Sequence, residues 1–144
     1  MKKILLTLMT ALTIITSVIA NEEKVKPEVL NAFNKRFAQA SNVSWTGNDN
    51  SYKAEFTYHN YTLVAWYNTK AELVRVTRNI SSALLPLYLQ GRLEMKYADY
   101  FVADLVEDSN QKGYSYYMIL QKGNQKIYLR SLHGSDWEKY NKNK

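Results

Sequence analysis

The chain of 144 residues contains no cysteine, and it has only two histidines, two prolines and five glycines. Without cysteine it can form no disulfide, no thiolate zinc site, no iron–sulfur cluster and no cysteine nucleophile. Two histidines leave little material for a histidine-rich metal site, and five glycines leave little for a phosphate-binding loop. We therefore expect no metal and no organic cofactor, and a fold that is held by packing alone.

The sequence also lacks the arrangements that usually carry out catalysis. Its serines lie in no Gly-x-Ser-x-Gly pattern. The carboxylate pairs Glu22–Glu23 and Glu107–Asp108 fall in a charged leader and in an expected polar turn, where nothing desolvates them for acid–base work. His59 and His133 fall in expected turns, which is typical of solvated surface residues. The sequence predicts a protein that is not an enzyme.

One long apolar run is present, at the N-terminus. Lys2 and Lys3 precede it, it extends over 4–19, and Val18 and Ala20 supply small residues ahead of a cleavage point. A run of about 16 residues is shorter than the roughly 20 that a membrane span needs. We interpret 1–20 as a signal peptide that is cleaved after Ala20. The chain is then expected in a periplasm or outside the cell, with no membrane attachment after cleavage.

The positive charge is lower in the expected mature chain, 21–144. The whole chain has a formal net charge of +6, and removal of Lys2 and Lys3 leaves +4. The remaining lysines and arginines are scattered along the sequence, whereas nucleic-acid binding needs them clustered on one face. The sequence therefore predicts no nucleic-acid partner.

Tyrosine dominates the aromatic residues, with twelve tyrosines beside four phenylalanines and three tryptophans. Apolar residues recur at helical spacing after Pro27, which predicts an amphipathic helix that ends near Ala40. From Val43 onwards apolar and polar residues alternate, which predicts strands. Turn residues divide this region into four strands, expected over 43–46, 52–57, 61–67 and 73–76.

A second set of the same elements follows. Ser82 and Pro86 predict the start of a helix that ends near Tyr97. Strands are expected over 100–106, 114–120, 126–132 and 137–140. When the first set of elements is displaced by 64 residues along the sequence, its apolar positions and its turns fall on those of the second set over about 25 residues. We predict an α+β fold: one domain over 21–144, built as a tandem repeat of a helix plus a four-stranded antiparallel meander (units 27–78 and 83–140), with the helices packed on one face of the sheet.

The side chains that face away from the expected helices are the candidates for function. Because successive side chains of a strand point to opposite faces, the alternation places four residues on the face away from the helices: Trp66, Tyr117, Tyr128 and Arg130. One interpretation is that tyrosines are good strand formers and bury half of each ring there. The other is that the face is a protein interface, because Tyr, Trp and Arg commonly anchor interfaces. A sugar-binding platform is a weaker alternative, since no carboxylate or amide is placed beside the rings.

A family resemblance rests on residues of the first unit. The paired Phe33 and Phe37, the segment Ala40-Ser-Asn-Val-Ser-Trp45, the strand Tyr52-Lys-Ala-Glu-Phe56 and the later Leu84-Leu-Pro86 stand in a familiar order. This pattern resembles the PepSY-like domains that are related in fold to β-lactamase inhibitor protein, small exported proteins common in Bacteroidetes. The glycine expected in the turn at Thr69-Lys70 is missing, and the second unit matches only in part.

The resemblance implies tandem helix-plus-meander units and an exported, non-enzymatic role. It implies a binding or inhibitor-like module whose partner is another protein, and it assigns no inhibitory residue. The alternative is a carrier that holds a small apolar ligand between helices and sheet.

Overall fold

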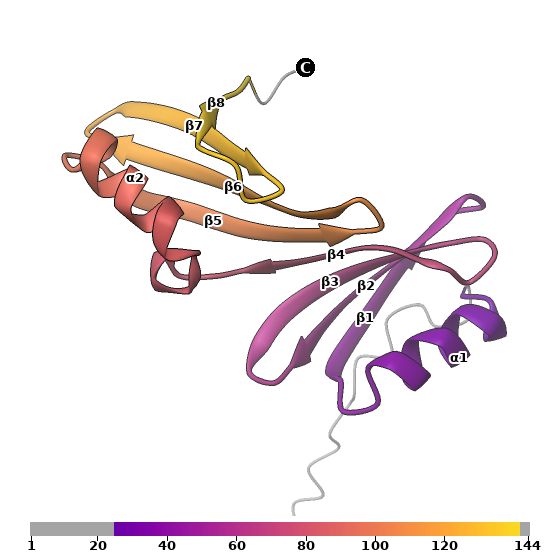
Figure 1. The fold of residues 1–144 in the computed structure, drawn as a ribbon. Coiled ribbons are helices and arrows are strands. Elements are labelled where there is room, and N and C mark those ends of the chain that lie inside the picture. Colours follow the sequence, from indigo (N-terminus) through magenta and orange to yellow (C-terminus); the bar gives the residue numbers. More distant parts are fainter. Residues whose placement is uncertain (1–24, 142–144) are drawn as a thin grey trace, which may run out of the picture.

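The structure, a computed structural model, describes residues 25–141. Within this range a helix followed by four strands is succeeded by a second helix and four further strands (Figure 1). The elements are α1 (Pro27–Arg36), β1 (Ser41–Gly47), β2 (Ser51–Tyr58), β3 (Tyr61–Asn68), β4 (Leu73–Asn79), the 3-10 turn η2 (Ser82–Leu84), α2 (Leu87–Tyr97), β5 (Phe101–Asn110), β6 (Gly113–Lys122), β7 (Gln125–Leu132) and β8 (Glu138–Lys139). The class is α+β, as the sequence predicts.

The strands form one antiparallel sheet in chain order from β1 to β8. Short turns join β1 to β4 in sequence and likewise β5 to β8, whereas η2 and α2 lie between β4 and β5. His59 and Asn60 adopt positive φ values of 46° and 66° in the β2–β3 turn. The pairing of β4 with β5 joins the two halves of the sheet, from Arg75 opposite Asn110 to Asn79 opposite Val106. The sheet is therefore continuous through the middle of the chain.

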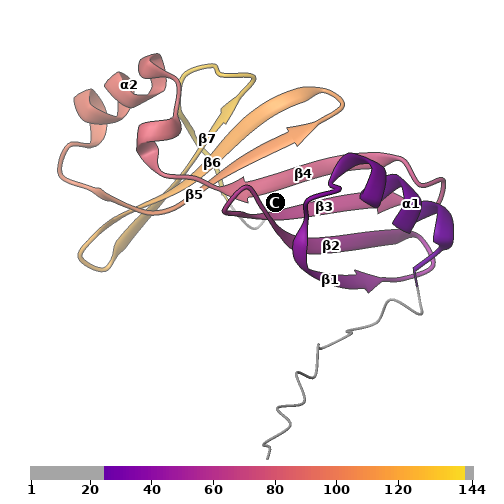
Figure 2. The same cartoon turned by 90° about the horizontal axis from the view of Figure 1, so that it is seen from below.

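Helix α1 covers the β1–β4 half of the sheet (Figures 1 and 2). Pro27 begins the helix, where its missing N–H costs no hydrogen bond, and Val29 and Phe33 point into the core. Phe33 is 2% exposed, and its ring centroid lies 5.1 Å from that of Trp45 and 4.8 Å from that of Phe56. An aromatic cluster thus connects the helix to the first half of the sheet.

Helix α2 lies against the other half of the sheet. Leu89 of this helix is fully buried in a cluster with Met118 and Leu129 of strands β6 and β7. The indole Nε1–H of Trp137 donates a hydrogen bond to the carbonyl of Leu89 at 3.0 Å, so the segment before β8 is tied to the helix. The aliphatic residues of this second core are mainly leucines, which have longer side chains than the valines and alanines of the core under α1.

The strand register places core residues of both halves on the same side of the sheet. Residues directly opposite each other in neighbouring strands point to one face. Leu63, Arg78, Glu107 and Tyr116 are such opposite residues across β3, β4, β5 and β6. Leu63 belongs to the core under α1 and Tyr116 to the core under α2. The opposite side, which we name the open face, has no helix over it among residues 25–141.

Three sequence expectations need correction. Helix α1 ends at Arg36 rather than near Ala40, since Phe37 leaves the helical conformation. Helix α2 begins after Pro86, and the segment near Ser82 forms η2 instead. Glu107 and Asp108 are not in a turn: β5 continues to Asn110 because these carboxylates find arginine partners on β4. The expected signal peptide and Glu22–Glu23 lie outside the described residues.

Asp136 ties α2 to the segment between β7 and β8. Its Oδ2 accepts hydrogen bonds from Arg92 Nε at 3.0 Å and Lys96 Nζ at 3.1 Å, and its Oδ1 accepts the Trp137 N–H at 2.8 Å. These bonds, that from Arg92 above all, hold the pKa of Asp136 well below its usual range. The fold therefore favours the charged carboxylate.

The lowered pKa gives stability a predictable dependence on pH. Stabilisation by Asp136 is complete above the unfolded-state pKa near 4 and is lost as the pH falls toward the lower folded-state pKa. We expect Asp136→Asn to lower the melting temperature at pH 7, and we expect the difference from the unsubstituted chain to shrink between pH 4 and pH 2. Thermal unfolding followed by circular dichroism measures this. A difference that stays constant over that range would contradict the assignment.

Candidate binding surface on the open face

The open face carries all four residues singled out in the sequence. Trp66 lies on β3, Tyr117 on β6, and Tyr128 and Arg130 on β7, and each is half-buried. The strand pairing places Tyr117 directly opposite Arg130. Trp66 is three strands away from Tyr117, so the four residues do not form one contact cluster.

Three tyrosines gather at the β6–β8 end of this face. The Tyr140 ring lies 5.8 Å from that of Tyr117 and 6.2 Å from that of Tyr128, both edge to face. Arg130 Nε donates to Glu138 Oε1 at 2.7 Å, and its guanidinium lies 6.0 Å from the Tyr140 ring. Burial above all, and then the neighbouring tyrosines, raise the pKa of Tyr140 above its usual range. The arrangement is a rigid, partly apolar surface with polar tips.

A second group lies around Arg75 on β4. The Arg75 guanidinium stacks 4.9 Å from the Trp66 ring and pairs with Asp108 Oδ2 at 2.6 Å. Asp108 is 4% exposed, and its Oδ1 has no hydrogen-bond partner among the described residues. Arg75 extends the surface from Trp66 toward the tyrosines.

A hollow of about 290 Å³ lies between these two groups. Arg75, Asp104, Val106, Tyr117, Ile119 and Tyr140 line it. The sequence reasoning missed Arg75, Asp104 and Tyr140 as site residues. The alternation of side chains along β5 is enough to place Asp104 on the open face. The orientation of Tyr140 could not be predicted in this way, because the strand before it has only two residues and shows no alternation.

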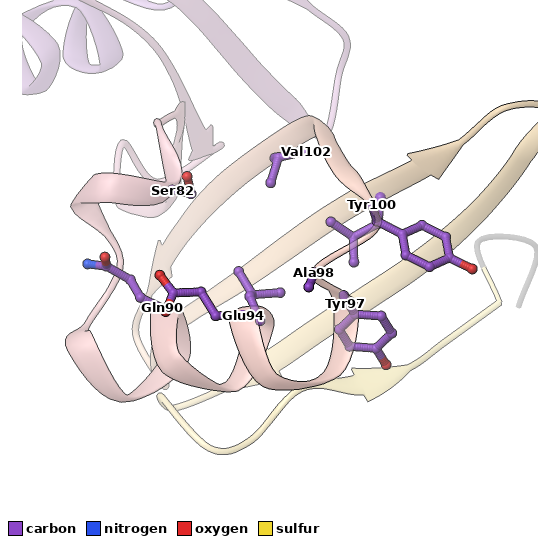
Figure 3. A pocket seen from close by; sticks show the side chains of 9 residues that line it. Ser82, Gln90, Glu94, Tyr97, Ala98, Tyr100 and Val102 are labelled. Carbon is purple, nitrogen blue, oxygen red and sulfur yellow. The ribbon is translucent and has the colours of Figure 1, made fainter.

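Hollows on the helix-bearing face are the places where a carrier would hold a small apolar ligand. Figure 3 shows the hollow between α2 and the sheet, whose lining includes Gln90, Leu93, Glu94 and Tyr97. Its volume is about 200 Å³, below the range of about 300–1,000 Å³ that is usual for ligand sites. A hollow of about 320 Å³ around Tyr61 and the Arg78–Glu107 ion pair is lined by no helix residue.

Histidine does not build a metal site in the described part of the chain. His59 and His133 are exposed and lie in turns, with φ values of 46° and 54°. Within residues 25–141 no three His, Asp or Glu side chains gather to hold an ion. In the same range no helix is both long enough and apolar enough to cross a membrane.

Comparison with solved structures places this fold among proteins of Bacteroides. A BLIP-like protein from Bacteroides fragilis superposes with a TM-score of 0.69 and 17% identity, over 80% of this chain and 84% of its own. The chain has the fold of the BLIP-like proteins. A DUF2874 family protein from Bacteroides uniformis matches with a TM-score of 0.70 and 15% identity, over 80% and 89% of the two chains.

A candidate periplasmic protein from Bacteroides eggerthii also superposes on this BLIP-like fold, with a TM-score of 0.69 and 15% identity, over 80% and 88% of the two chains. No known sequence family matches the chain, and no curated protein does. The resemblance read from the sequence is confirmed as a likeness to BLIP-like proteins of Bacteroides.

Proposed function

We propose that the chain is an exported, non-enzymatic module that binds another protein on the open face of its sheet. The observation that carries this proposal is the surface formed by Trp66, Arg75, Tyr117, Tyr128 and Tyr140 on a face that no described helix covers. Trp, Tyr and Arg are the residues that most often supply interface binding energy. These side chains are already held by strands and by one another, so little conformational entropy is lost on binding.

Export is supported by two separate observations. The N-terminal segment 1–20 has the charge, apolar run and small residues of a signal peptide. A solved neighbour from Bacteroides eggerthii is described as a candidate periplasmic protein. The proposal therefore places residues 21–144 in a periplasm or outside the cell.

The module is further proposed to be a tandem repeat. Strand β7 (Gln125–Leu132) occupies the positions of β3 (Tyr61–Asn68) displaced by 64 residues. In both sets a helix precedes the meander and buries apolar residues against its own half of the sheet. On this view the open face combines two similar strand surfaces, of which the second carries the tyrosine cluster.

Capture from periplasmic extract with alanine variants tests the binding proposal. We expect a protein retained by the immobilised chain to be lost with Trp66→Ala and with Tyr128→Ala, because each removes a half-buried anchor. An anchor of this kind is worth about 2 kcal/mol or more of binding free energy, roughly thirtyfold in affinity. Leu87→Ala, which truncates an 84% exposed side chain on α2, is the control and retains the partner.

Thermal unfolding of the same variants separates binding from folding. Loss of capture with an unchanged melting temperature supports the interface. Unfolding of both Trp66→Ala and Tyr128→Ala, or capture that persists in both, contradicts it.

A further inference from the structure

Asp104 differs from the other carboxylates at the centre of the open face. Asp108 pairs with Arg75, and Glu138 pairs with Arg130. Asp104 Oδ1 accepts a hydrogen bond from the Asn79 amide at 3.0 Å, and no lysine or arginine among residues 25–141 lies within 4 Å of its carboxylate. Within the described range, a carboxylate that pairs with no lysine or arginine therefore lines the hollow.

The charges that residues 25–141 place around the hollow sum to a negative balance. Arg75 contributes one positive charge to the lining, and Asp108 cancels it through their ion pair. Asp104 adds one further negative charge, which the low-dielectric walls of a concave site concentrate.

The aromatic walls of the hollow also favour a cation. Tyr117 and Tyr140 stand edge to face with ring centroids 5.8 Å apart, and both line the hollow. The face of an aromatic ring attracts ammonium and guanidinium groups. The Arg130 guanidinium already lies 6.0 Å from the Tyr140 ring, so this cluster accommodates such a contact within the chain itself.

We propose that this hollow receives a lysine or arginine side chain of the partner protein, with Asp104 as its counter-ion and Tyr117 and Tyr140 as its walls. The inference rests on the proposed binding function and assigns the chemistry of the partner at this position. A volume of about 290 Å³ suits one inserted side chain, and Val106 and Ile119 contact its aliphatic stem.

A titration with N-acetyl-L-arginine amide, followed in ¹H–¹⁵N NMR spectra of the chain 21–144, tests this directly. We expect shifts of the backbone amides at 104–106, 117–119 and 140, with millimolar affinity. The neutral isostere N-acetyl-L-citrulline amide should leave these amides unmoved. Asp104→Asn should weaken binding of the arginine compound about three- to fivefold. Asp49→Asn, in the turn between β1 and β2, is the matched control and should bind as the unsubstituted chain does.

Three results would overturn the assignment: equal shifts with the citrulline compound, unweakened binding by Asp104→Asn, or binding that appears only after residues 142–144 are deleted. The last result would assign the hollow to the lysines of this chain.

Failure of this inference is distinguishable from failure of the proposed function. If partner capture is lost with Tyr128→Ala and intact with Asp104→Asn, the open face binds a protein but the hollow takes no basic side chain.

Discussion

Replacing Leu89 by alanine is expected to lower the free energy of unfolding by about 2–5 kcal/mol. Leu89 is fully buried at the centre of the core between α2 and strands β6 and β7. Truncation removes apolar contact and leaves a cavity, because the carbonyl of Leu89 stays bonded to Trp137 and limits how far the helix can move inward. Urea unfolding monitored by circular dichroism measures the loss.

The same helix provides a matched control for this prediction. Leu87 is 84% exposed, two residues before Leu89. Leu87→Ala should change stability by no more than about 0.5 kcal/mol, as is usual for surface positions. Equal losses for the two variants would contradict the described packing of α2.

Truncation of Phe33 should have the largest effect in the first half of the chain. Phe33 is 2% exposed, and its ring lies between those of Phe37, Trp45 and Phe56 at centroid distances of 4.8–5.4 Å. Phe33→Ala removes this burial together with several edge-to-face contacts, so we expect a loss of about 3–5 kcal/mol. Urea unfolding at pH 7 gives the value.

Phe101 is the corresponding control for the aromatic core. It lies at the start of β5 and is 57% exposed. Phe101→Ala should cost far less than Phe33→Ala, about 1 kcal/mol at most. A small effect of Phe33→Ala would show that α1 does not hold the first half of the sheet together.

Local signals were sufficient to predict the strands around the hairpin turns. In β2 the alternation of Tyr52, Ala54 and Phe56 with polar neighbours follows from one buried and one open face, and the structure buries all three. The turns at 59–60 and 123–124 require residues that tolerate positive φ, and His59, Asn60 and Gly123 adopt it. These features depend on residues that are close together in the chain, so a local sequence pattern is sufficient to predict them.

The length of β5 and the hollow beside it depend on contacts between distant residues. Glu107 and Asp108 resemble turn residues in isolation, yet Arg78 and Arg75 stabilise them within the strand from about 30 positions earlier in the chain. Through the same long-range pairing, Arg75 lines the hollow that Asp104 and Tyr140 also line. No periodicity in the sequence encodes which charges meet across β4 and β5, so this part of the candidate site became visible only in three dimensions.

Site-specific photocross-linking tests most directly whether the open face is the binding surface. A benzoylphenylalanine introduced in place of Tyr128 stands on that face, and one in place of Leu87 stands on the outer side of α2. In periplasmic extract the account predicts a covalent adduct of defined mass from position 128, absent from position 87 and reduced when Trp66→Ala is added. An adduct from position 87 with none from position 128 would contradict it.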